Sequence, residues 1–280
     1  MRTQYLSQLK AVVYGAAVGD ALGVPFEFLH RDTFECKGMC AGGYHNMPLG
    51  TFSDDTSLLI ATCDSIRKTK RIDIHDMRAK FRQWCFESRY SADGKVFDVG
   101  NATVTALDQS FGCSHERSNG NGSLMRIAPL AFTDASDDQI RSVSAITHAH
   151  TISTESCVVF VHILRHVLGG MPLQSAIAQS VPKDPRFAFL GTIQQLERDG
   201  VNSGGFVLHT LEAALWCALT TDSYRDCVLA AVNLGSDTDT TACVAGALAG
   251  AIYGYSAIPA EWIDQLRGRQ VIDSCLFDAE

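Results

Sequence analysis

Apolar residues recur at intervals of three and four positions along most of the chain. This spacing places them on one face of an α-helix, which has about 3.6 residues per turn. The pattern predicts helices over residues 5–21, 56–67, 75–86, 102–111, 136–149, 153–168, 206–219, 224–234 and 240–253. The alternation typical of strands is nearly absent, so the sequence predicts an all-α helical bundle.

One stretch, residues 242–252, is apolar on almost every side. A helix of this kind is buried on all faces, and its small residues allow neighbouring helices to come close. Glycine-containing segments at 42–43, 120–122, 169–170 and 204–205 separate the periodic stretches, as expected for connections between helices. No internal repeat is detected.

Composition favours a single globular unit. The chain has 280 residues, of which 46% are hydrophobic and 19% charged, and no Pro/Ser-rich linker divides it. We therefore expect one compact domain over residues 1–280. The formal net charge of -8 argues against a nucleic-acid partner, because no basic stripe offsets the phosphate charge.

The sequence also indicates the cellular location of the protein and the oxidation state of its cysteines. The first ten residues lack an apolar signal-peptide core, and the apolar stretch 242–255 is too short to span a membrane. We expect a cytoplasmic protein without a membrane partner. The ten cysteines are scattered and include no CxxC pair, which favours reduced thiols over disulfides or a zinc site.

Two short acidic motifs carry the clearest chemical signal. Ser53-Asp54-Asp55-Thr56 and the stretch 235–240, which reads Gly-Ser-Asp-Thr-Asp-Thr, each come at the start of a predicted helix. Helix starts favour Asp and Ser even without a function, and Ser53 and Ser236 are plausible caps. Capping requires one oxygen per helix, however, and does not explain paired carboxylates. Carboxylates together with hydroxyl groups form the hard oxygen set that Mg²⁺ or Mn²⁺ takes.

For other residues the sequence alone gives only an ordinary structural interpretation, and the functional alternative comes from the resemblance described next. The segment 120–122 is a turn or a loop that approaches a phosphate, and His148 is a core residue or a ligand contact. Asp98 precedes a predicted helix, so it is a cap or a functional acid. Glu27 follows a Pro turn, so it is a surface residue or part of a site.

Taken in order, the motifs resemble those of one family. They are residues 14–23 with Glu27, then 53–56, 98–101, 120–126, Thr147-His148 and 235–240. This set, which spans about residues 14–255, resembles the ADP-ribosylglycohydrolase family, which includes dinitrogenase reductase-activating glycohydrolases and ADP-ribosylarginine hydrolases. The resemblance implies an all-α, single-domain bundle with a buried cleft that holds two divalent cations, Mg²⁺ or Mn²⁺.

The resemblance also implies roles for individual residues. The implied metal ligands are Ser53, Asp54, Asp55, Asp237, Asp239 and Thr240. The implied catalytic residues are Asp98, Glu27 and Asp55, with Asp98 or Glu27 relaying a proton. The residues implied to bind ADP-ribose are Ser118, Gly120, Asn121, Gly122, His148 and Gly100.

The function that follows is hydrolysis of ADP-ribose from a modified protein, with free ADP-ribose as product. The resemblance favours the N-glycosidic bond to arginine, because the stretch 98–101 is more similar to arginine-directed members. Two alternatives remain: a noncatalytic ADP-ribose binder or toxin-neutralising immunity partner, and a metal-dependent nucleotide phosphohydrolase. The retained oxygen ligands favour the enzyme over the binder.

Overall fold

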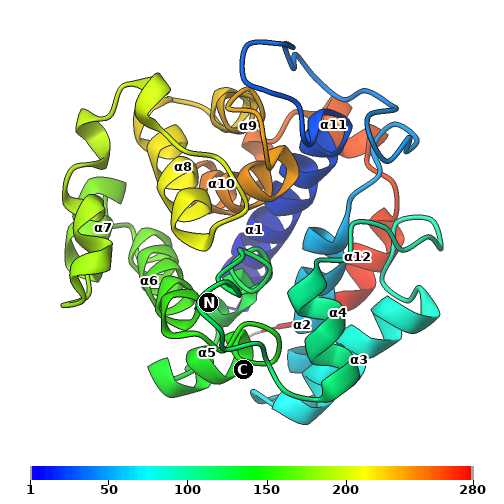
Figure 1. The fold of residues 1–280 in the computed structure, drawn as a ribbon. Helices are drawn as coiled ribbons and strands as arrows, with labels where there is room; N and C mark the ends of the chain where they lie inside the picture. The colour runs from blue at the N-terminus through cyan, green and yellow to red at the C-terminus, as the bar shows by residue number, and fades with distance from the viewer. Residues whose placement is uncertain (1, 279–280) are drawn as a thin grey trace.

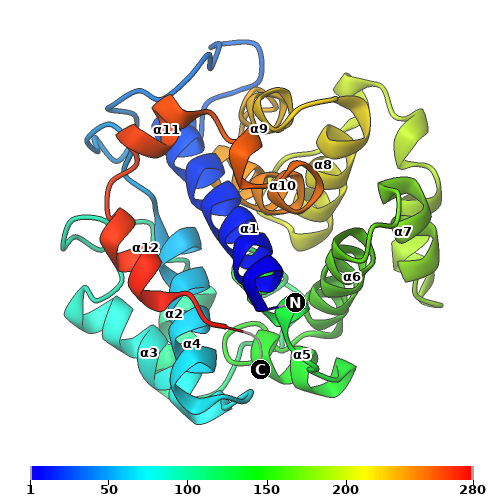
Figure 2. The same cartoon turned by 180° about the vertical axis from the view of Figure 1, so that it is seen from behind.

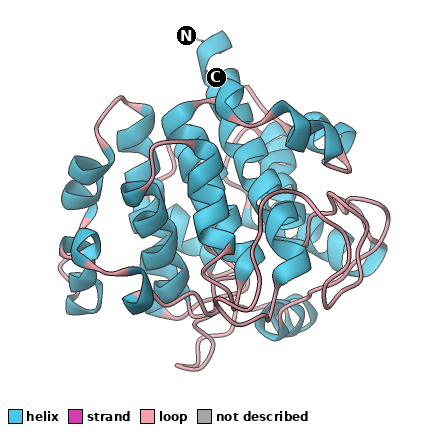
Figure 3. Cartoon of the chain, turned by 90° about the horizontal axis from the view of Figure 1, so that it is seen from above, coloured by secondary structure: helices cyan, strands magenta, loops and turns pink. Residues whose placement is uncertain are grey.

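The structure, a computed structural model, describes residues 2–278 and, within that range, the side chains from residue 5 onward. Figure 3 shows helices and loops but no strand in this part of the chain. The α-helices are α1 (Arg2–Gly23), α2 (Asp54–Thr69), α3 (Ile74–Glu87), α4 (Asn101–Gln109), α5 (Asp137–Ser144), α6 (Thr151–Leu168), α7 (Leu173–Ser180), α8 (Val207–Thr220), α9 (Tyr224–Val232), α10 (Thr238–Tyr253), α11 (Ala260–Gln265) and α12 (Arg269–Cys275). The expected all-α class is confirmed.

The helices surround α1, which runs through the middle of the molecule (Figures 1 and 2). On one side α10 packs along α1, and α8 and α9 pack on α10. On the other side α2 contacts α1, with α3 and α12 packed against α2. Buried apolar side chains from Leu9 to Phe277 form one cluster. Each helix predicted from periodicity is present, although the bounds shift.

The contact between α1 and α10 is made by backbone against backbone. A Cβ added to Gly15 would lie 2.3 Å from Gly246 O, and one added to Gly250 would lie 2.2 Å from Ala11 O. On α10, Gly246 and Gly250 are four residues apart and therefore lie on the same face of the helix, the face that meets α1. The all-round apolar character of 242–252 is thus explained, since α10 is buried from Thr238 to Gly250. Helix α1 is itself long and apolar enough to cross a membrane, but 89% of its apolar window is buried inside the molecule.

One predicted helix is shorter than expected. The pattern predicted a helix over 136–149, but α5 ends at Ser144. The buried guanidinium of Arg126, from a distant loop, donates to the carbonyl oxygens of Val143 and Ser144 and to Thr147 Oγ1. These bonds use the carbonyl groups at the helix end, so a tertiary contact ends the helix where the local pattern would continue it.

Three helices were not predicted at all. Helix α7 has eight residues, α11 six and α12 seven. So few turns give too few repeats for a periodic pattern to be recognised.

The close contact between α1 and α10 generates a stability prediction. A Cβ on Gly246 would lie 2.2 Å from Gly15 O, so Gly246→Ala must push two buried helices apart. We expect a loss of about 3 kcal/mol or more in the free energy of unfolding, measured by urea denaturation. As a matched control, a Cβ on Gly191 meets nothing within 4 Å, so Gly191→Ala should change stability by less than about 0.5 kcal/mol. Equal unfolding midpoints for the two variants would contradict the interpretation.

Candidate active site

The starts of α2 and α10 meet in the interior, beside α1. Thr240 Oγ1 donates a hydrogen bond to Asp55 Oδ2 at 3.3 Å, although the two residues are 185 positions apart. Carboxylate oxygens of Asp20, Asp55 and Asp239 lie within 4.8 Å of one another. The structure therefore brings the two acidic motifs together and adds a carboxylate from α1.

The start of α2 combines a capped helix with two buried carboxylates. Ser53 is the N-cap, and its Oγ accepts a hydrogen bond from the Asp55 N–H and donates to Asp55 Oδ2 at 3.0 Å. Asp54 is 7% exposed and lines a pocket, whereas Asp55 is fully buried. Capping therefore accounts for the hydroxyl of Ser53, but it leaves the paired carboxylates for another role.

The start of α10 is not capped as the sequence suggested. Ser236 lies outside the helix with φ of 67°, and Asp237 occupies the N-cap position without a side-chain cap bond. Asp237 Oδ2 instead accepts a hydrogen bond from Asn121 Nδ2 at 2.8 Å. The capping alternative is wrong for this motif.

Asp20 is a buried acid to which the sequence reasoning gave no role. Its carboxylate accepts hydrogen bonds from Ser53 N at 2.9 and 3.1 Å, and from Thr56 N and Oγ1 at 3.0 and 2.6 Å. It thus stabilises the N-terminus of α2, where free N–H groups and the helix dipole favour an anion. Burial raises the pKa of Asp20 to about 6. The available signal was a charged residue within an apolar helical segment.

Two buried carboxylate oxygens have no hydrogen-bond partner within the described residues: Asp55 Oδ1 and Asp239 Oδ2. Burial raises the pKa of both carboxyls well above the usual range. The next largest cause is the negative charge of Asp20 for Asp55 and that of Glu27 for Asp239. Unpaired buried carboxylates are costly, whereas divalent cations prefer hard oxygen ligands of this kind. The donor set therefore fits a divalent cation.

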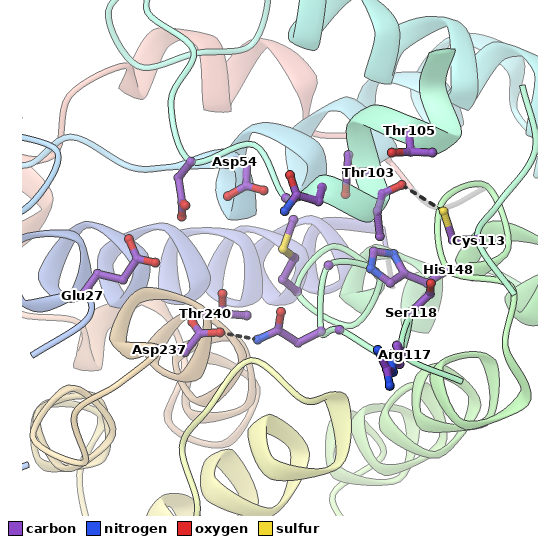
Figure 4. Close-up of a pocket in the computed structure, with 18 residues that line it drawn as sticks. Glu27, Asp54, Thr103, Thr105, Cys113, Arg117, Ser118, His148, Asp237 and Thr240 are labelled. Carbon is purple, nitrogen blue, oxygen red and sulfur yellow. Dashed lines mark hydrogen bonds between the residues drawn. The ribbon is translucent and has the colours of Figure 1, made fainter. Parts of the chain in front are cut away.

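A pocket of about 530 Å³ opens beside this centre (Figure 4). Of the expected site residues, those that line it are Glu27, Asp54, Asp98, Gly100, Ser118, Gly120, Asn121, Gly122, His148, Asp237 and Thr240. Glu27, Asp54 and Asp237 lie toward one end of the pocket, and Ser118 and His148 toward the other. Ser53, Asp55 and Asp239 are buried and do not line it. Asp55, expected both as a metal ligand and as a catalytic residue, therefore does not face the pocket, and both roles stay predictions.

Asn121 links the glycine loop to the acidic centre. Besides its bond to Asp237, its Nδ2 donates to Thr210 Oγ1 at 2.9 Å. Its backbone N–H donates to Gly205 O at 3.1 Å and is thus not free to bind a diphosphate. If the loop approaches a phosphate, as predicted, it does so without the N–H of Asn121, whose side chain instead holds Asp237.

The two flanking glycines have different neighbours. A Cβ on Gly122 would lie 2.8 Å from His148 Cε1, so this glycine is needed for packing. A Cβ on Gly120 would meet His148 Nε2 at 3.5 Å, an ordinary contact. Packing within the described residues therefore tolerates a side chain at Gly120, which leaves its pocket face for a ligand.

His148 is buried and neutral. Burial, with a smaller effect of the Arg126 charge, lowers its pKa to about 3. Its Nδ1 lies 2.9 Å from Thr147 Oγ1, which accepts a hydrogen bond from Arg126 at 2.8 Å. This arrangement favours donation from the Thr147 hydroxyl to Nδ1 and a proton on Nε2. His150, by contrast, caps α6 and accepts from Ile152 N, so the two histidines do not form a metal pair.

Glu27 is hydrogen-bonded to His45, a residue that the sequence did not indicate as part of the site. The Nε2 of His45 lies 2.6 Å from Glu27 Oε2 and 3.8 Å from Asp98 Oδ1. Burial, and next the charge of Asp98, raises the pKa of Glu27 to about 9. Burial also raises the pKa of Asp98, although the charge interaction with His45 acts to lower it. Glu27 is therefore not a surface residue, and Asp98 is not the cap of α4, whose N-cap is Gly100.

His45 gave no signal in the sequence. It lies in the long connection before α2, which has neither periodicity nor a motif. Its contact with Glu27 and Asp98 depends on loops that only the fold brings together.

Comparison with known proteins places this site in a family. A family model described as ADP-ribosylglycohydrolase matches residues 1–279. The ADP-ribosylarginine hydrolase Tri1 of Serratia proteamaculans (strain 568) is 35% identical over 282 residues, which cover 94% of this chain and 76% of the relative. The protein of the same name from Pseudomonas putida (strain GB-1) is 32% identical, over 98% of this chain and 79% of the relative.

A solved structure also matches. It is titled "ADP-ribosylglycohydrolase-related protein complex" and superposes with a TM-score of 0.84 at 30% identity, covering 98% of this chain and 96% of the other. The sequence match and the shared fold thus extend over nearly the whole chain and include both acidic motifs. The chain belongs to the ADP-ribosylglycohydrolase family.

Proposed function

We propose that this chain hydrolyses the N-glycosidic bond between ADP-ribose and an arginine side chain of a modified protein, and releases ADP-ribose. The observation that carries the proposal is the meeting of two acidic helix starts, with unpartnered oxygens on Asp55 and Asp239, beside a pocket of about 530 Å³. The names of the two relatives, ADP-ribosylarginine hydrolase, support arginine as the modified residue. The many carboxylates at one end of the pocket suit a guanidinium leaving group.

We propose two divalent cations, Mg²⁺ or Mn²⁺, as cofactors. The residues that would bind them are Asp54, Asp55, Asp237, Asp239 and Thr240, while Asp20 and Ser53 support this set through hydrogen bonds. When bound, such cations supply Lewis acidity for the activation of water and fix sugar hydroxyls. Asn121 orients the carboxylate of Asp237, because its amide donates to one of the two oxygens.

The remaining polar residues bind the nucleotide and deliver a proton. A neutral His148 offers its Nε2 proton to the ligand at the end of the pocket opposite Glu27. Glu27, whose pKa is raised to about 9, carries a proton on its carboxyl at neutral pH in the cation-free protein. We assign Glu27, through its Oε atoms, as the proton donor to the departing guanidine, with Asp98 as its partner across His45.

Linkage specificity tests the function directly. We expect ADP-ribose release from an arginine-linked peptide in Mg²⁺, no release after chelation with EDTA, and much slower release from a serine-linked peptide. Asp54→Asn should lower kcat by about a hundredfold or more with little change in helical content, because it removes a charged ligand that faces the pocket. Product chromatography separates the alternatives: AMP would indicate a phosphohydrolase, and binding without turnover a noncatalytic binder. Release from serine alone would overturn the arginine assignment.

The raised pKa values predict how stability depends on pH. The pKa of Glu27 is raised from 4.5 to about 9 and that of Asp20 from 3.8 to about 6, so the folded state binds more protons than the unfolded state. Their contribution is present at low pH and is lost as pH rises through the folded pKa values. Burial also raises the pKa of the proposed ligands Asp55 and Asp239, and Mg²⁺ binds deprotonated carboxylates, so the increase in Tm caused by Mg²⁺ should be larger at about pH 8 than at about pH 5.

The control for this measurement is Glu27→Gln. This variant cannot titrate at residue 27, so in EDTA its Tm should fall less between about pH 5 and pH 8 than that of the unchanged protein. An Mg²⁺-induced change in Tm that is independent of pH would contradict cation binding by the carboxylates of Asp55 and Asp239.

The glycine loop generates a binding prediction. Because a Cβ on Gly120 meets only an ordinary contact, Gly120→Ala should leave the free energy of unfolding within about 1 kcal/mol of wild type. If a ligand lies against this glycine, the same substitution should weaken ADP-ribose binding about tenfold or more in calorimetry. Gly122→Ala is the comparison: its Cβ would displace His148, so it should affect both stability and binding. Normal ADP-ribose affinity in Gly120→Ala would show that the ligand does not approach there.

A further inference from the structure

A partly exposed group of aromatic rings lies beside Glu27 and Asp98, two acidic residues that line the pocket, although the rings themselves do not line it. It consists of Phe28, Tyr44, His45 and Phe97, which we call the aromatic rim. The rings of Phe28 and Tyr44 meet edge to face at 5.0 Å, and His45 lies 5.1 Å from both Tyr44 and Phe97. Phe28 is 55% exposed and Tyr44 76%, so two large rings of the rim face solvent.

Phe28 is exposed, and its backbone conformation is energetically unfavourable. Its backbone has φ of 67°, a left-handed conformation that a bulky residue rarely adopts. The conformation is fixed by two 2.8 Å hydrogen bonds, from Phe28 N to Ser236 O and from Ser236 N to Leu29 O. Backbone strain of this kind persists mainly at functional sites, and exposed aromatic groups often mark binding surfaces.

The rim is continuous with the acidic centre. Glu27 precedes Phe28 in the chain, Asp98 follows Phe97, and His45 contacts both carboxylates. Glu27 lies at the end of the pocket away from His148 and Ser118 (Figure 4). If the nucleotide lies toward His148, the group attached to the ribose points toward Glu27 and the rim.

The chemistry of this end matches one kind of occupant. Aromatic faces attract a guanidinium, and oxygen atoms of the neighbouring acidic residues can accept its hydrogen bonds. Exposed Tyr and Phe side chains are also typical of surfaces that bind polypeptides. We propose that Phe28 and Tyr44 form the docking surface for the modified arginine and the polypeptide segment that carries it. This inference rests on the proposed function.

Steady-state kinetics with two substrates test the docking surface. One substrate is an arginine-linked ADP-ribosylated peptide, and the other is ADP-ribosylated agmatine, which has the guanidinium but no peptide. We expect Phe28→Ala and Tyr44→Ala each to raise KM for the peptide about threefold to tenfold, with kcat within about twofold. The rise in KM should be smaller for the agmatine conjugate, and calorimetric affinity for ADP-ribose should be unchanged. Tyr44→Phe, which keeps the ring, should restore the wild-type KM.

The matched control is Phe86→Ala. Phe86, on α3, is 53% exposed, and its ring packs against the guanidinium of Arg82 rather than against the aromatic rim, so its removal should leave both KM values unchanged. An unchanged peptide KM in the rim variants, or an equal rise for both substrates, would overturn the polypeptide contact while leaving the proposed function intact. Failure of the unaltered protein to release ADP-ribose from either arginine-linked substrate would overturn the proposed function and the docking surface together.

Discussion

The backbone contact between α1 and α10 is the constraint on which the site depends. Gly15, Gly19 and Gly23 recur along α1, and a Cβ on the last of these would lie 2.4 Å from the backbone of Asp239. The contact therefore extends to the first turn of α10. Because the next residue after Gly19 is Asp20, the same approach fixes the distance between the carboxylates of α1 and α10. Small residues thus set the geometry of a charged centre.

This centre concentrates like charges that the protein alone does not neutralise. Asp20 is satisfied by the N-terminus of α2, and Asp237 by Asn121, but Asp55 and Asp239 each keep an unpartnered oxygen. A hydrophobic core surrounds the cluster and raises its carboxyl pKa values. The fold therefore accepts a local electrostatic cost, which a bound divalent cation would offset.

Periodicity and motifs predicted the features that depend on residues close together in the sequence. Features that depend on contacts between distant segments were seen only in the structure. Long amphipathic or apolar helices were predictable, whereas α7, α11 and α12 are too short to show a period. The end of α5 was missed because Arg126, from another segment, binds its terminal carbonyl groups. The motifs located Asp54 and Asp237, but the contact of His45 with Glu27 arises only when distant loops meet.

The contact between α1 and α10 also bears on how the protein is made. Its two partners are far apart in the sequence, since α1 spans Arg2–Gly23 and α10 spans Thr238–Tyr253. During synthesis, α1 leaves the ribosome long before α10 has been translated. Until then, the apolar face of α1 is not buried against α10. Contacts of such high sequence separation form late and slowly. The acidic centre is consequently assembled only after α10 has been translated, and nascent chains that end before Thr238 lack it.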